Sequence, residues 1–117
     1  MYEDFSTVER WTGTPVRCVF QCIIMAIATR HADAVDVKFL VNDRPVWIAL
    51  AHPAWLEHFK KTGNVITDPL AVEIAGHYLR SILENGDESG RDLYTLSLAE
   101  TLQHLDGVLK EAESVAK

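Results

Sequence analysis

Two apolar segments separated by only two residues constrain the fold of this chain more than any other feature. The segments cover residues 36–41 and 44–50, and the dipeptide Asn42-Asp43 lies between them. Asn and Asp tolerate the left-handed backbone conformation that two-residue hairpin turns require. Pro45 lacks a backbone N–H, so it fits the beginning of an edge strand. We therefore predict an antiparallel β-hairpin over these two segments.

The mostly apolar run of residues 16–28 has two interpretations. Thr14 is a favourable N-cap, and Pro15 suits the first position of a helix. The β-branched residues of the run would also fit a strand, but strict alternation of apolar and polar residues is missing. We predict that the run is the central buried helix, in which Cys18 and Cys22 are packed, unreactive thiols.

Three more segments have the pattern of amphipathic helices. They cover residues 54–61, residues 69–85 and the segment that begins at Ser97. A proline at or just before the first position favours the start of the first two helices. Ser97 and Glu100 have the spacing of a capping box, in which each side chain binds the backbone N–H of the other residue.

The expected element order is α-β-β-α-α-α, which describes a small, mostly helical α+β domain with one β-hairpin. A chain of 117 residues has the size of one domain, so we expect a single domain over 1–117. Residues 1–13 form an N-terminal arm, and its large apolar side chains should dock on the rest of the domain. These side chains are Tyr2, Phe5, Val8 and Trp11.

The net charge of −6 is confined to the second half of the chain. Residues 1–62 contain seven acidic and seven basic residues, whereas residues 63–117 contain ten acidic and four basic residues. An acidic surface repels phosphate backbones and anionic lipids, so we expect no direct binding of nucleic acid or membranes. It favours a protein partner with a basic surface. The candidate partner-binding residues are Glu84, Asp87, Glu88, Asp92 and Glu100.

No motif in the sequence defines a reaction. It contains no nucleophile elbow, no glycine-rich phosphate loop and no His-Glu-x-x-His motif. We therefore expect no cofactor, no metal and no catalytic residues. The alternative is a small-ligand or metal-dependent enzyme that uses Glu73 and His77 together with His52 or His58.

The last predicted helix carries leucines at a spacing of four, three and four residues. They are Leu98, Leu102, Leu105 and Leu109. A narrow apolar seam with charged flanks is typical of paired helices, and two-fold dimers are the commonest oligomers. Two hypotheses have equal support: the seam is the interface of a homodimer, or it packs within its own domain.

The leading functional hypothesis is a non-catalytic protein that binds another protein, as an accessory, inhibitor or immunity-type subunit. A further alternative is an acidic mimic of nucleic acid, although the acidic residues are spread along the chain. The acidic N-terminal residues do not have the pattern of a secretory signal, and the two cysteines form no Cys-x-x-Cys motif. We expect a cytoplasmic protein.

Overall fold

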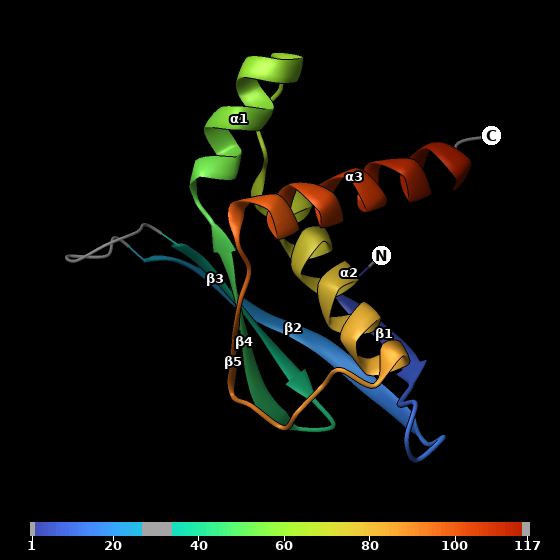
Figure 1. Cartoon of the computed structure of the whole chain (residues 1–117). Helices are drawn as coiled ribbons and strands as arrows, with labels where there is room; N and C mark the ends of the chain where they lie inside the picture. Colours follow the sequence, from blue (N-terminus) through green and yellow to red (C-terminus); the bar gives the residue numbers. More distant parts are fainter. Residues whose placement is uncertain (1, 27–33, 116–117) are drawn as a thin grey trace.

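The computed structural model describes residues 2–26 and 34–115 of the chain, and Figure 1 shows their arrangement. Within these residues the elements follow one another in the order β-β-β-β-α-α-β-α. Their bounds are β1 Asp4–Val8, β2 Pro15–Ala26, β3 Ala34–Val41, β4 Arg44–Ala51, α1 Pro53–Thr62, α2 Asp68–Asn85, β5 Leu93–Thr95 and α3 Leu98–Val115.

The strands form one five-stranded sheet whose spatial order equals the order along the chain, β1-β2-β3-β4-β5. The first four strands pair antiparallel, and β5 pairs in parallel with β4. The predicted fold class is therefore wrong in its main feature. Residues 2–26 and 34–115 combine a five-stranded mixed sheet with three helices, and they do not form a mostly helical domain with one hairpin.

The segment predicted as the central buried helix is the long strand β2, so that prediction is wrong. Between Phe20 and Cys22 the register with β3 shifts, and Gln21 is the extra residue of a β-bulge. A bulge reverses the faces to which the following side chains point, so the strand loses its regular alternation. Cys18 is buried in the core, but Cys22 is partly exposed. Residues 27 and 28 of the predicted helix lie outside the described residues.

The predicted N-terminal arm contributes a strand. Residues 4–8 form β1 and pair with β2 along their whole length. Tyr2 is buried, with 2% of its surface exposed. Trp11 is 73% exposed, although its indole Nε1 donates a hydrogen bond to the carbonyl oxygen of Gly86 at 2.9 Å. The arm is thus part of the sheet as well as docked on the helices.

The predicted hairpin is confirmed by β3 and β4. Asn42 and Asp43 have φ angles of 48° and 70°, which is the left-handed conformation of a two-residue hairpin turn. The strand β4 is not at the edge, because β5 pairs with it. The pairing with β5 covers only residues 47–49, so Pro45 lies outside it and its missing N–H removes no bond to β5.

The other three predicted helices are confirmed as α1, α2 and α3. The α1 helix ends at Gly63, which has the left-handed conformation of a C-cap. The α2 helix is capped by the Thr67 hydroxyl, which accepts a hydrogen bond from the Leu70 N–H at 3.3 Å. Ser97 and Glu100 form the capping box, with reciprocal bonds of 3.0 and 3.1 Å.

The helices α2 and α3 pack on one side of the sheet, and within the described residues no helix packs on the other side (Figure 1). Along β3, buried and partly exposed residues alternate. We call the face that carries Val37 and Phe39 the covered face. The face that carries Asp36, Lys38 and Leu40 is the open face. The hydrophobic core lies between the covered face and the helices.

Candidate functional site

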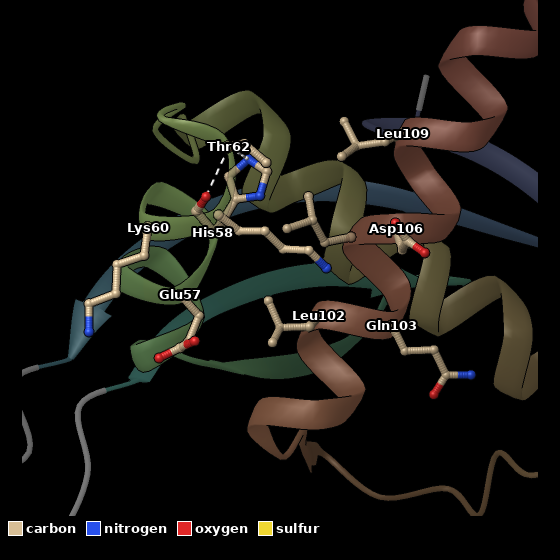
Figure 2. Close-up of a pocket in the computed structure, with 10 residues that line it drawn as sticks. Glu57, His58, Lys60, Thr62, Leu102, Gln103, Asp106 and Leu109 are labelled. Carbon is tan, nitrogen blue, oxygen red and sulfur yellow. Dashed lines mark hydrogen bonds between the residues drawn. The ribbon is translucent and has the colours of Figure 1, made fainter.

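A groove of about 610 Å³ lies between α1 and α3. Figure 2 shows Leu102 and Leu109 extending from α3 toward α1. The α3 side of the groove is therefore largely apolar, and the α1 side is largely charged. The lining residues that matter most are Glu57, Lys60 and Lys61 on α1 and Leu102, Leu105, Asp106 and Leu109 on α3.

The groove is open because α1 is anchored through one side only. Ala54 and His58 are buried, and Trp55 packs partly buried against the core. On the opposite side of the helix, Leu56 and Phe59 are 56% and 51% exposed. Figure 1 shows α1 projecting from the rest of the molecule. The helix thus forms a projecting wall beside α3.

The two walls of the groove differ in charge. Within the described residues, neither Lys60 nor Lys61 lies within ion-pair distance of a carboxylate. Asp106 on α3 is paired with Lys110 at 3.4 Å. Glu57 is the acidic residue among the α1 lining residues. The α1 wall is therefore net positive in a chain whose net charge is −6.

The leucines predicted as a dimer interface occupy different environments. Leu105 is buried in the core of its own domain, with 3% exposed, and Leu102 packs partly buried against the core. Leu98 and Leu109 are 38% and 41% exposed. The inner part of the seam therefore serves the domain itself, and its outer part lines the groove or faces solvent.

Among the acidic residues predicted to bind a partner, Glu84 and Glu100 bind groups of their own chain. Glu84 accepts hydrogen bonds from the Thr7 hydroxyl and from Arg80 Nε, the latter at 3.2 Å. Glu100 closes the capping box of α3. Both carboxylates have a role in the fold, which reduces their availability for a partner.

Glu88 has an internal role as well. It accepts a hydrogen bond from the Tyr94 hydroxyl at 2.6 Å and pairs with Arg44 at 3.1 Å. Burial by itself would raise the pKa of Glu88, but the hydrogen bonds from Tyr94, from the Gly90 N–H and from Arg44 together lower that pKa. Asp87 is exposed, and Asp92 is exposed and lies 3.8 Å from the same Arg44. That these five acids bind a partner stays a prediction.

The structure brings together polar residues that the sequence analysis did not associate. The Nδ1 atoms of His77 on α2 and His104 on α3 are 2.8 Å apart. Glu111 Oε1 lies 3.5 Å from His77 Nε2 and accepts a hydrogen bond from the Tyr2 hydroxyl at 2.8 Å. Burial lowers the pKa of both histidines, and burial with the Glu111 hydrogen bond raises the pKa of Tyr2 to about 12. Through these contacts the cluster connects Tyr2, α2 and α3.

The residues of the alternative enzyme hypothesis have separate partners. His52 stacks on Trp55 with ring centroids 5.7 Å apart. His58 contacts a threonine of its own helix, and His77 contacts the histidine of α3. Glu73 Oε2 accepts a hydrogen bond from the backbone N–H of Tyr2 at 2.6 Å. In the described part of the chain, no group of three or more His, Cys, Asp or Glu residues could hold a metal ion.

Comparisons with protein-family models, with curated proteins and with solved structures found no match for this chain. None of the helices in the described ranges is long and apolar enough to cross a membrane. Fold and groove define the class: a small two-layer α+β domain with an accessible groove between two of its helices.

Proposed function

We propose that the protein is a non-catalytic binding protein whose groove between α1 and α3 holds a helical segment of another protein. The observation that carries this proposal is the combination of an apolar wall on α3 with a projecting wall on α1. Exposed apolar surface that is gathered in a concave site is typical of an interaction site. The alternative as an enzyme has less support, because its proposed residues have separate partners.

The dimensions of the groove suit a helix. The α1 helix has 10 residues, and at a rise of 1.5 Å per residue its wall is about 15 Å long. A helical segment of about three turns has the same length. Leu102 and Leu109 are seven residues apart on one face of α3, so an apolar stripe on the partner can pack along them, while Leu105 between them is buried in the core.

The charge of the groove favours a partner helix with acidic residues beside its apolar stripe. Lys60 and Lys61 have no ion pair within the described residues, so they are available to carboxylates of the partner. Charge complementarity of this kind adds specificity and speeds association. This partner differs from the basic partner expected from the sequence, because Glu84, Glu88 and Glu100 are engaged in the fold.

Selection from a displayed library of helical peptides tests the proposal. We expect the selected peptides to carry apolar residues at positions i, i+3 or i+4 and i+7, flanked by Asp or Glu. Binding should be lost in the variant L109E and retained in L98E. Both variants replace a leucine of α3 with similar exposure, but Leu98 does not line the groove.

A second pair of variants tests the charge. The double variant K60E/K61E should lose binding to the acidic peptides, whereas K110E, which changes a lysine outside the set that lines the groove, should keep most of it. A library that yields no binder to the folded protein would overturn the proposal. Binders that are indifferent to L109E would overturn it as well.

A further inference from the structure

The open face of the sheet is unusually apolar for a face without a covering layer. An antiparallel sheet with one solvated face normally presents polar side chains on that face. Here the strand register places many apolar residues on it, of which Val8, Ile24 and Leu93 are 52%, 49% and 51% exposed. Other apolar residues on this face are Val19, Cys22, Ala34, Leu40, Trp47 and Ala49, and Ala49 is 5% exposed between its neighbours.

Two opposite charges lie in the middle of this face. Asp36 and Lys38 belong to β3, the central strand, and are two residues apart on the same side. Neither of them forms an ion pair with another described residue. The Lys38 ammonium lies 5.7 Å from the ring centroid of Trp47, and burial raises the pKa of Asp36. Each charge is therefore available to a charge of opposite sign above the face.

We propose that a second copy of this chain covers the open face, in a two-fold dimer whose sheets stack face to face. A two-fold axis that lies between the sheets and crosses β3 at right angles near Val37 sets Asp36 of each copy opposite Lys38 of the other. One symmetry operation thus forms two ion pairs, as an interface between identical surfaces requires. Stacked sheets lie about 10 Å apart, a gap that two facing side chains fill.

The same axis places large side chains opposite small ones. In the register, Trp47 lies beside Lys38, and Ala49 lies beside Asp36. Because the axis sets Lys38 of one copy opposite Asp36 of the other, it also sets Trp47, the neighbour of Lys38, opposite Ala49, the neighbour of Asp36. Alternation of large and small residues across facing layers lets the side chains interdigitate.

Two further pairs of facing residues also combine a large side chain with a small one. Cys22 pairs with Lys38 and Ile24 with Asp36, so the axis sets Ile24 opposite Cys22 of the second copy. Along β3, Leu40 follows Val37 by three residues and Ala34 precedes it by three residues. The axis at Val37 therefore sets Leu40 of one copy opposite Ala34 of the other. The surface is complementary to itself in both charge and shape.

Molecular mass in solution, measured by light scattering on a size-exclusion column, tests this dimer. The wild type should have twice the monomer mass of 13.1 kDa. The variants D36K and K38D should each be folded monomers, because each places like charges opposite one another. A mixture of the two variants should form dimers again, since one partner then supplies both positive charges and the other both negative charges.

The variant K110D serves as the control, because it makes the same change of charge on α3 and should remain dimeric. Circular dichroism shows whether each variant is folded, and the mixing experiment needs only folded monomers. A wild type that is monomeric at every concentration would overturn the proposal. A dimer that persists in D36K and K38D but is lost in L109E would also overturn it and assign the interface to the leucine seam of α3. The peptide-binding test of the groove is independent of these outcomes.

Discussion

The two faces of the sheet are made by the same strands but have different surroundings. On β3, Phe39 is 0% exposed beneath the helices, whereas its neighbour Leu40 is partly exposed on the other side. The open face carries exposed apolar side chains such as Ile24 and Leu93 beside the charged residues Asp36 and Lys38. The contrast teaches that apolar content on both sides of a strand does not show which side its own domain covers.

The two cysteines provide the most sensitive comparison of the faces. Cys18 lies on the covered face with 0% exposure, and burial raises the pKa of its thiol to about 12. Labelling of Cys18 requires an opening that costs several kcal/mol, so we expect it to react at least about 1,000-fold more slowly than in denaturant. Cys22 on the open face should label rapidly in dilute native protein.

The variants C22S and C18A isolate the two thiols for this measurement, which uses a chromogenic thiol reagent. Rapid native labelling of C22S would contradict the placement of Cys18 on the covered face. Slowing of Cys22 labelling in C18A at high protein concentration would sharpen the comparison, because the proposed dimer covers Cys22.

Truncation of adjacent residues on β3 gives the next largest difference. The variant F39A removes a fully buried ring and should lower the free energy of unfolding by about 3–5 kcal/mol. The variant L40A removes a partly exposed side chain, so in dilute protein it should cost no more than about 1 kcal/mol. Urea unfolding measures both values, and similar losses in the two variants would contradict the assignment of the faces.

The sequence contained enough information for the local elements of the fold. Turn chemistry at Asn42-Asp43, the prolines at the starts of α1 and α2 and the capping box at Ser97 depend on neighbours in the chain, so these elements are readable from it. The strand β2 was not readable, because the bulge at Gln21 shifts the alternation and both of its faces carry apolar residues. In such a run, the apolar pattern of the sequence does not distinguish a helix from a strand.

The candidate site was less accessible to sequence analysis than the fold. The groove depends on the position of α1 relative to α3, and the contact between His77 and His104 joins two helices. No local pattern encodes such a distance in a single sequence. A usable signal was the Lys60-Lys61 doublet at the end of a predicted helix, which indicates a basic spot on an acidic chain.

The layer above the covered face depends on a close approach of α2 and α3 at Gly107. Alanine normally stabilises a helix interior by about 1 kcal/mol relative to glycine. At this position a Cβ atom would lie 2.8 Å from Cε1 of His77, so the imidazole ring would have to move away from its contact with His104. We expect G107A to lower the free energy of unfolding by about 1–2 kcal/mol, because overpacking outweighs the helix propensity.

The double variant G107A/H77A separates these two effects. Without the imidazole ring the alanine should regain its usual advantage, so in the H77A background G107A should stabilise the protein by about 1 kcal/mol. Thermal or urea unfolding of the four proteins in this cycle gives the coupling. A stabilising effect of G107A in the wild-type background would show that the helices are not in close contact at this point.

The smallest expected effect is the pH dependence of the contact between α2 and α3. Burial lowers the pKa of His77, with a further contribution from Arg80, whereas Glu111 opposes this shift. Burial and the neighbouring imidazole lower the pKa of His104, and Glu100 opposes that shift. Because the unfolded chain has histidine pKa values near about 6.5, it binds protons that the folded chain does not bind as the pH falls below this value.

The contribution of this histidine pair to the free energy of unfolding should therefore be complete above about pH 6.5 and should decrease as the pH falls below that value. The geometry supports the same sign, because two Nδ1 atoms 2.8 Å apart can share one proton but not two. Urea unfolding at several pH values measures the slope in the wild type and in H77N/H104N. The variant should have the smaller slope, since the remaining histidines are common to both proteins. Equal slopes would mean that the two imidazoles are as free to take up protons in the folded protein as in the unfolded chain, and that the contact does not persist in solution.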